Sequence, residues 1–330
     1  HIVFDGWSFG ILAREFGLLY SAFVANEPAP LPDLAFQYAD YAKWQRDWLK
    51  GAVLERQLSY WTERLRGCPP LLELPTDWPR AAVGSLSGAE FPFTISTELS
   101  TELRTLSRKQ GVTLFMTLLA GFEILLYYHT GREDLVVGTD VANRNRAEIE
   151  ALIGFFINLL ALRVSLGGNP TCTELLARIR ETTLSAYARQ DLPFDRVVEA
   201  LRPARCLDSA PIFQVKLVTH NVPLPLLRLP DLALQAVPIE RELVELDLVL
   251  HVFEDSDAFR CLFEYRRDLF EAATIARFAK QYVGILGQAV AAQDTPLQGF
   301  VEKLASEEQP AQGEVKERVS SVKRKGIRIS

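Results

Sequence analysis

The sequence predicts an α/β fold in which a mixed sheet is flanked by helices. Two observations lead to this prediction: stretches of alternating apolar and polar residues, typical of strands, intermix with stretches that repeat apolar residues at helical spacing. The chain has 330 residues, of which 48% are hydrophobic and 24% are charged. Because this composition is ordinary for globular proteins, one large domain or two smaller ones can form a sizeable core.

The first part of the chain is predicted to be largely helical. Phe16 and Leu19 belong to a helical repeat of apolar residues within residues 6–24, and a Pro-rich stretch follows it. Residues 36–65 form a second helical block that is rich in Tyr and Trp. The Pro- and Gly-rich residues 67–88 then predict an extended connection across the surface.

Strands and helices alternate through the rest of the chain. Alternating or β-branched patterns predict strands at residues 90–95, 135–139, 213–219, 232–239, 246–253 and 259–265. Helical periodicity predicts helices at residues 100–109, 114–128, 173–189 and 271–290. From about residue 305 the chain becomes polar and then basic, which is typical of an interdomain linker.

Charge and composition narrow the classes of partner. A net charge of −6 gives no general attraction to nucleic acid or to an anionic membrane, so we expect neither as a partner. The most apolar stretch, residues 151–162, is broken by Gly154 and Asn158 and is too short to cross a bilayer. The cysteines lie far apart in the sequence, so we expect no metal site, no redox pair and a cytoplasmic location.

A motif that can carry chemistry stands at the first residues. His1, Asp5 and Gly6 follow the pattern H-x-x-x-D-G, with Trp7 and Ser8 directly after it. The pattern alone is weak, because a histidine and an aspartate four residues apart occur by chance in many proteins. It resembles the end of an HHxxxDG signature whose first histidine would precede residue 1. An apolar, strand-like run that opens on a histidine also leads us to expect a segment upstream.

Further signatures follow this motif in the order of one family. Residues 36–44 resemble a YxDFAxW segment, residues 153–158 an IGFFVN segment, residues 190–195 a QDYPFE segment, residues 209–214 an SPLFQ segment and residues 268–275 a DLFDAATI segment. With the first motif they cover nearly everything from His1 to about residue 297. On these motifs the chain resembles the condensation domains of nonribosomal peptide synthetases, truncated at the N-terminus.

This resemblance implies a fold of two lobes, each like chloramphenicol acetyltransferase, with the histidine at their junction. Residues 1–30 would end the first lobe, residues 31–300 would form the second lobe, and residues 301–330 would be an interdomain linker. A fragment without most of the first lobe is expected to be inactive alone.

The implied reaction is amide bond formation between a donor acyl or peptidyl thioester and an acceptor aminoacyl thioester. Both substrates would be tethered to phosphopantetheine arms of donor and acceptor carrier domains, and the domain itself would bind no cofactor. The resemblance also implies an adjacent adenylation or tailoring domain as a neighbour in a larger synthetase.

The catalytic candidates are His1, Asp5 and Gly6. Amide formation needs a route for the proton of the amine, and an imidazole at His1 can either take that proton or orient the amine. Asp5 would be ionised at neutral pH, so we interpret it as structural, pairing with an arginine to fix the histidine loop as the family implies. Gly6 either offers its N–H to the developing oxyanion or is a plain turn glycine.

The other motif residues have a structural interpretation beside the functional one. We expect Ser8 to be the N-cap of the first helix rather than a nucleophile, since no triad partner is near it in sequence. Asn158 either lines the substrate channel or hydrogen-bonds the backbone. The remaining candidates for a substrate channel or a structural motif are Trp7, Arg163, Gln190, Asp191, Pro193, Phe194 and Gln214.

Three further groups of residues are expected to be structural or solvated. Core positions are expected for Trp44, Trp48 and Trp61. No catalytic or metal role is expected for the widely spaced His129, His220 and His251, which lack carboxylates at ligand spacing. The charged loop 144–146 is expected to be solvated, with contact to a phosphopantetheine arm as the alternative.

Rival functions also follow from the resemblance. Heterocyclisation members of the family replace the histidines by aspartate, which His1 contradicts, and epimerisation members usually have Ser-Trp-Arg where this chain has Ser8, Phe9 and Gly10. A non-catalytic module that recruits a partner enzyme or carrier protein is the alternative from another class. The residue before His1 discriminates between that module and the enzyme.

Overall fold

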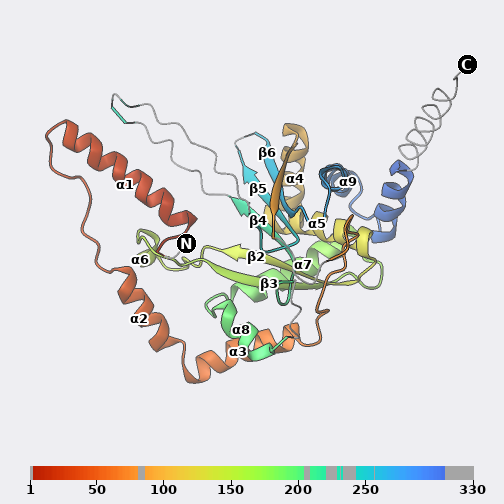
Figure 1. The fold of residues 1–330 in the computed structure, drawn as a ribbon, viewed down its shortest axis with the longest axis horizontal. Helices are drawn as coiled ribbons and strands as arrows, with labels where there is room; N and C mark the ends of the chain where they lie inside the picture. The colour runs from red at the N-terminus through yellow and green to blue at the C-terminus, as the bar shows by residue number, and fades with distance from the viewer. Residues whose placement is uncertain are drawn as a thin grey trace, which may run out of the picture.

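A six-stranded mixed sheet lies at the centre of the part of the chain that the structure describes (Figure 1). The computed structural model describes residues 3–80, 86–203, 209–220, 229–230, 232, 243–255 and 257–308. From edge to edge the sheet contains β1 (Gly88–Ile95), β6 (Phe259–Arg266), β5 (Leu248–Glu254), β4 (Val215–His220), β2 (Asp134–Val141) and β3 (Asn158–Ser165). β4 is parallel to both of its neighbours, and the other neighbouring strands are antiparallel. The predicted α/β class with a mixed sheet is confirmed.

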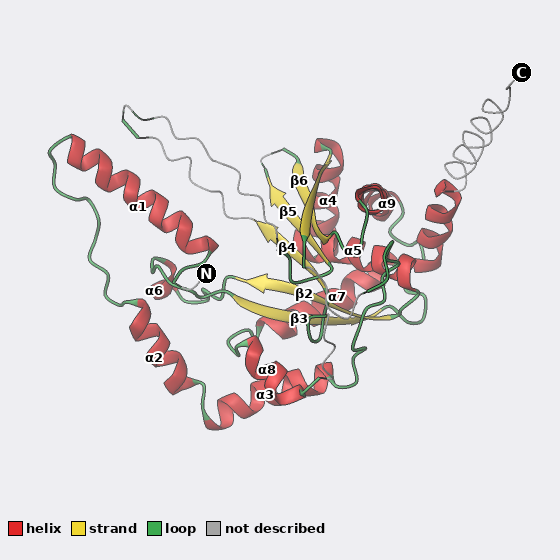
Figure 2. Cartoon of the chain, viewed as in Figure 1, coloured by secondary structure: helices red, strands yellow, loops and turns green. Residues whose placement is uncertain are grey.

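Helices α4 (Thr97–Gln110), α5 (Leu114–Thr130), α7 (Cys172–Tyr187) and α9 (Ala272–Ala291) pack against this sheet and close the core (Figure 2). α5 is central, since its residues 116–126 are all buried. The Tyr282 hydroxyl of α9 donates a hydrogen bond to the Leu118 carbonyl of α5 at 3.1 Å. No single helix among the described residues is long and apolar enough to span a membrane; α4 and α5 pass that test only as a pair bent by 105°.

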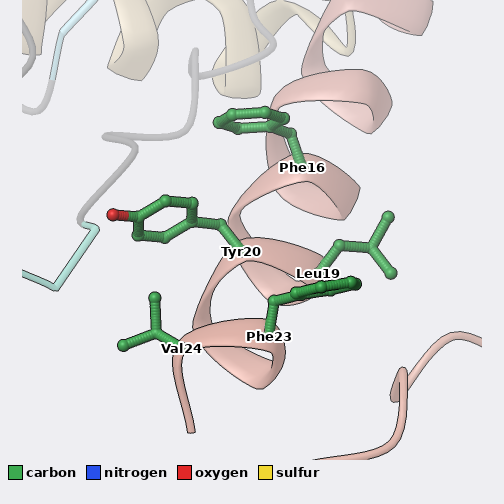
Figure 3. A pocket seen from close by; sticks show the side chains of 5 residues that line it. All are labelled: Phe16, Leu19, Tyr20, Phe23 and Val24. Atoms are coloured by element: carbon green, nitrogen blue, oxygen red, sulfur yellow. The ribbon is translucent and has the colours of Figure 1, made fainter. Parts of the chain in front are cut away.

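Three helices precede this sandwich of sheet and helices in the chain (Figure 1), and of these α3 (Gly51–Leu65) contributes buried residues to the core. α1 (Gly6–Val24) and α2 (Tyr38–Trp48) stand apart from the sheet, and α3 packs against α8 (Phe194–Leu201). The apolar residues Phe16, Leu19, Tyr20, Phe23 and Val24 line a shallow, open pocket on α1 (Figure 3). The Phe16 side chain is 52% exposed and that of Phe23 is 88% exposed, so this face of α1 is not part of the core.

Within the described residues, the predicted elements agree with the structure in type, but some boundaries differ and some elements were not predicted. The predicted helical block 36–65 is divided into α2 and α3, because Leu49 and Lys50 leave helical geometry. The edge strand β3, the short α6 (Ala147–Glu150) and α8 were not predicted. The predicted strand 232–239 lies outside the described residues except for Leu232. After α9, residues 297–308 form a further helix that buries Phe300 and Leu304. This further helix extends past residue 300, where we expected the linker to begin.

Candidate active site

The first turn of α1 carries the residues of the H-x-x-x-D-G motif that the structure describes. His1 lies outside the described residues. Asp5 is the N-cap of α1: its backbone is extended (φ −121°, ψ 179°) and its Oδ1 accepts a hydrogen bond from the Ser8 N–H at 2.9 Å. An aspartate suits this position because it satisfies a free N–H and complements the helix dipole. The prediction that Ser8 is the N-cap is wrong, because the helix already begins at Gly6.

The Asp5 carboxylate also joins α1 to residues 149–157, which we call the bridge segment. Its Oδ2 accepts hydrogen bonds from the backbone N–H of Phe156 at 2.9 Å and of Ile157 at 3.2 Å. The Asp5 side chain is only 2% exposed. Two oxygens therefore accept three backbone N–H groups from two separate parts of the chain.

The surroundings of Asp5 favour its ionised form. Burial acts to raise the pKa of Asp5, but the backbone N–H groups of Ser8 and Phe156, the Ser8 hydroxyl and the Arg144 guanidinium lower it, and the net pKa is below its usual value. At neutral pH Asp5 is therefore a hydrogen-bond acceptor without a proton to donate.

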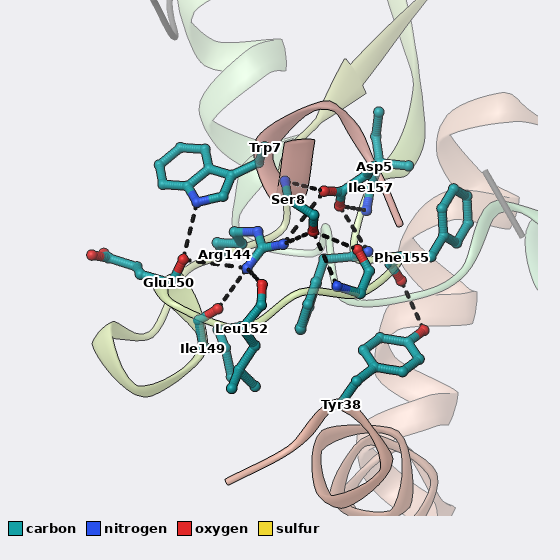
Figure 4. Close-up of polar contacts among 12 residues, drawn as sticks. Asp5, Trp7, Ser8, Tyr38, Arg144, Ile149, Glu150, Leu152, Phe155 and Ile157 are labelled. Carbon is teal, nitrogen blue, oxygen red and sulfur yellow. Dashed lines mark hydrogen bonds and ion pairs between the residues drawn. The ribbon is translucent and has the colours of Figure 1, made fainter. Parts of the chain in front are cut away.

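Arg144, in the loop after β2, holds the bridge segment from the other side (Figure 4). Its Nη1 donates to the carbonyl oxygens of Ile149 at 2.6 Å and Leu152 at 2.8 Å. Its Nη2 donates to Ser8 Oγ at 2.7 Å and lies 3.4 Å from Asp5 Oδ1. The Arg144 side chain is 1% exposed, so the expectation of a solvated Arg144 is wrong.

Aromatic rings complete the surroundings of Arg144. Its guanidinium carbon lies 4.0 Å from the centroid of the Phe156 ring and 5.8 Å from that of the Trp7 ring, distances typical of cation–π contacts. Trp7 Nε1 also donates to the Glu150 carbonyl at 3.0 Å. Trp7 thus contacts both the bridge segment and the arginine that holds it.

Ser8 and Tyr38 fix the middle of the bridge segment. Ser8 Oγ donates to the Gly154 carbonyl at 2.8 Å and accepts from the Gly154 N–H at 3.0 Å. The Tyr38 hydroxyl donates to the Phe155 carbonyl at 2.8 Å. A Cβ on Gly154 would lie 2.1 Å from the Tyr38 Cδ2, so this close approach requires a glycine.

Gly6 has different surroundings from Gly154. A Cβ added to Gly6 would meet no heavy atom within 4 Å, and its φ is not in the left-handed region. Neither packing among the described residues nor backbone strain therefore explains a glycine at position 6.

Asn158 joins the end of the bridge segment to the turn before α8. Its Nδ2 donates to the carbonyl oxygens of Gln190 and Leu192, both at 2.7 Å, and its Oδ1 accepts from the Phe194 N–H at 3.1 Å. The Asn158 amide therefore makes hydrogen bonds to backbone on both of its polar atoms. The same turn has two further tethers: Asp191 accepts a hydrogen bond from Asn145 at 3.0 Å, and Pro193 is the N-cap residue of α8.

Arg163 and Gln214 also form extensive structural contacts. Arg163 makes a bidentate contact with Asp134 at 2.8 and 2.7 Å, and its Nη1 donates to the Arg66 carbonyl at 2.8 Å. Gln214 accepts a hydrogen bond from the Leu72 N–H at 2.7 Å and donates to the Ala210 carbonyl at 2.9 Å. Neither side chain is brought to the first turn of α1 by these contacts.

His129, His220 and His251 lie away from the motif, but the last two are neighbours. His220 Nε2 lies 3.0 Å from His251 Nδ1 on adjacent strands, and His251 Nε2 lies 3.9 Å from Glu264 Oε2. The two histidines are far apart in the sequence, so the sequence alone did not predict that they are in contact. His129 is half-buried against the Phe278 ring, and this partial burial lowers its pKa.

The tryptophans differ from one another in burial. Trp61 is 2% exposed and belongs to the core, as predicted. Trp44 and Trp48 are only partly buried and stack on each other at 5.4 Å, and Arg146 lies 4.4 Å from the Trp44 ring. The prediction of core positions is therefore correct for Trp61 alone.

The missed residues of the site are Arg144 and Gly154. Both lie more than a hundred residues from Asp5 in sequence, so periodicity and spacing near the motif do not point to them. The only signals were the family patterns: the aspartate pairs with an arginine that the sequence alone did not identify, and Gly154 lies within residues 153–158, which resemble the IGFFVN segment.

Comparison with known proteins identifies the class to which this fold and these motif residues belong. The model of the condensation domain family matches residues 1–312, and the chain belongs to this family. The similar proteins include linear gramicidin synthase and malpibaldin synthetase, and the similar structures include a condensation domain.

The curated relatives are much longer than the chain. It is 49% identical over 288 residues to a linear gramicidin synthase protein of Brevibacillus parabrevis, covering 87% of this chain and 4% of that protein. It is 44% identical over 302 residues to malpibaldin synthetase of Mortierella alpina, covering 92% of this chain and 5% of that protein. The chain thus spans a small part of the proteins that it matches.

Solved structures agree with this family. The X-domain from teicoplanin biosynthesis superposes with a TM-score of 0.82 at 26% identity, covering 90% of this chain and 69% of that chain. SgcC5 from Streptomyces globisporus superposes with a TM-score of 0.76 at 28% identity, covering 90% and 68%. The condensation domain of the monacolin K polyketide synthase MokA has the same fold, with a TM-score of 0.76 at 22% identity, covering 89% and 69%.

Proposed function

We propose that the protein joins a donor acyl or peptidyl thioester to an acceptor aminoacyl thioester through an amide bond. The observation that carries this proposal is the H-x-x-x-D-G motif at His1, Asp5 and Gly6 in a chain of the condensation domain family. The buried contacts of Asp5 support it, because they hold the first turn of α1 in one place relative to the bridge segment.

The reaction needs little activation of its substrates. The amine nitrogen attacks the thioester carbonyl carbon, the carbon–sulfur bond breaks, and the proton lost by the amine is balanced by protonation of the leaving thiolate, which departs as the free thiol of the donor arm. An α-amine has a pKa near 8, so about a tenth of it is neutral at pH 7, and the thioester is already an activated acyl group. His1 either takes the proton or orients the amine, and Asp5 has a structural role.

We further propose that both substrates reach the domain on carrier proteins. Their phosphopantetheine arms are tethers that belong to the carriers and not to this domain. A larger cytoplasmic synthetase with an adjacent adenylation or tailoring domain would supply the carriers, in keeping with relatives that are many times longer than the chain.

We also propose that residues 1–30 complete a first lobe and residues 31–300 form a second. The exposed apolar face of α1 supports this division, because a helix normally buries such a face against another element. The solved relatives offer further support, since about a third of each of their chains has no counterpart here: the chain covers 69% of the teicoplanin X-domain and 68% of SgcC5.

A second candidate is a module that recruits a partner without catalysis. The observation in its favour is the likeness to the teicoplanin X-domain, which has also been solved in a complex with OxyB. Against it stand the motif residues His1, Asp5 and Gly6, which suit catalysis.

The test uses the intact protein with one donor-loaded and one acceptor-loaded carrier. Mass spectrometry of the acceptor carrier should reveal a dipeptidyl thioester, and chiral analysis of the released product should show an unchanged donor stereocentre. Binding of both carriers without product would favour the recruiting module. An inverted stereocentre without a new amide would favour an epimerisation enzyme.

A further inference from the structure

Ser8 is the residue at which α1 meets the bridge segment most closely. Its side chain is 0% exposed. Its Oγ takes part in three hydrogen bonds: it donates to the Gly154 carbonyl at 2.8 Å and accepts from the Gly154 N–H at 3.0 Å and from Arg144 Nη2 at 2.7 Å. A hydroxyl has one donor and two acceptor sites, so these contacts use its full capacity.

Arg144 is bound to α1 more closely through Ser8 than through Asp5. The Nη2 atom lies 2.7 Å from Ser8 Oγ but 3.4 Å from Asp5 Oδ1. Hydrogen bonds from N–H to oxygen are usually about 2.9 Å long, so the shorter contact is the stronger one. The Asp5 oxygens already accept the N–H groups of Ser8, Phe156 and Ile157.

We propose that Ser8 is a positioning residue for the amide-forming reaction, a proposal that rests on the proposed function. Its hydroxyl ties the first turn of α1 to the bridge segment and to Arg144 at once. The motif leads directly into this turn, since only residues 2–4 separate His1 from Asp5. Movement of the turn relative to the bridge segment would therefore move the motif, and a displacement of about 1 Å can slow a reaction by about 100-fold.

The test compares Ser8→Ala with a matched control in the intact protein. Ser107→Ala also removes a buried hydroxyl, one that donates to the Leu103 carbonyl at 2.7 Å and contacts Thr117 Oγ1 at 2.7 Å within the α4–α5 region. Ser8→Cys retains a weaker hydrogen-bonding atom and serves if the alanine variant does not fold. Two quantities are measured for each variant: kcat per folded molecule and hydrogen exchange of the Gly154 amide.

The expected result for Ser8→Ala is a kcat about 10- to 100-fold lower, with faster exchange at Gly154. Ser8→Cys should fall between the wild type and Ser8→Ala, and Ser107→Ala should match the wild type in both quantities. An unchanged kcat with faster exchange would make Ser8 merely structural and overturn the proposal. A lower kcat with unchanged exchange would also overturn it, because the bridge segment would then be uninvolved.

The two proposals fail in different ways. If the wild type forms no dipeptidyl thioester, the proposed function fails and the role of Ser8 in the reaction fails with it. If the wild type forms product and Ser8→Ala forms it equally fast, only the positioning role is contradicted.

Discussion

Asp5 and Glu123 are both buried carboxyl groups, but their surroundings are opposite in kind. Asp5 accepts hydrogen bonds from three backbone N–H groups and lies beside Arg144. Glu123, in the buried part of α5, is 0% exposed, and neither of its side-chain oxygens has a hydrogen-bond partner among the described residues. The net pKa of Asp5 is lowered, whereas burial raises the pKa of Glu123 well above its usual value.

Asp5→Asn should destabilise the protein at neutral pH by about 2 kcal/mol, because an amide cannot accept all the hydrogen bonds that the carboxylate accepts. The lowered pKa of Asp5 means that its charged form stabilises the fold above its unfolded pKa near 4, and that this stability is lost as the pH falls through the folded pKa. Denaturant unfolding from pH 7 to pH 3 should therefore show the two proteins converging at low pH. Equal stability at pH 7 would contradict this interpretation.

Glu123→Gln should show the opposite dependence on pH. The folded protein keeps Glu123 protonated after the unfolded chain has released this proton, so wild-type stability should fall as the pH rises above about 4.3, by up to about 1.4 kcal/mol per pH unit. Denaturant unfolding from pH 5 to pH 8 should show the wild type losing stability relative to Glu123→Gln. Parallel curves for Glu123→Gln would contradict the raised pKa.

Local sequence determines where helices and strands form more completely than it determines how they contact one another. α1, Gly6–Val24, coincides with the predicted helical repeat over residues 6–24, although its N-cap is Asp5 and not the expected Ser8. α8 was missed although Pro193 stands directly before it, a position at the start of a helix where proline is tolerated. The division between α2 and α3 was hidden because the amphipathic pattern continues through Leu49 and Lys50.

Gly138 of β2 lies so close to the Phe213 ring that the packing of this strand depends on the absence of a side chain at position 138. A Cβ at this position of β2 would lie 2.2 Å from Cε2 of Phe213. Gly138→Ala should therefore lower the unfolding free energy by about 1 to 3 kcal/mol, as expected for overpacking, and Phe213→Leu in the same chain should restore part of it. Gly287→Ala in α9 is the control, since its Cβ would meet nothing within 4 Å. Equal denaturation midpoints for Gly138→Ala and Gly287→Ala would contradict this packing.

For the whole molecule, the sequence predicted the fold class and the family but not the contacts that build the site. The motifs are short and local, so residues 153–158 and 190–195 could be recognised from their letters. Their partners are not local: Ser8 meets Gly154, and Asn158 meets Gln190, through the fold alone. The sequence therefore predicted which segments belong to the site, but it did not predict which of their atoms form hydrogen bonds with one another.

The exposed face of α1 should make the 330-residue chain self-associate. Phe16 and Phe23 are 52% and 88% exposed, and apolar faces of this kind tend to find a partner. Sedimentation velocity should show oligomers that become fewer on dilution and with the double change Phe16→Lys and Phe23→Lys. Glu15→Gln, a change of charge on the same helix, is the control. A monomeric wild-type chain at all concentrations would count against this prediction.

The proposed reaction depends on the imidazole of His1. The most direct measurement is the single-turnover rate of dipeptidyl thioester formation by the intact protein, compared between the wild type and His1→Ala. The rate should fall by about 100- to 10,000-fold while the unfolding temperature stays the same. Equal rates in the two proteins would contradict the assignment of His1.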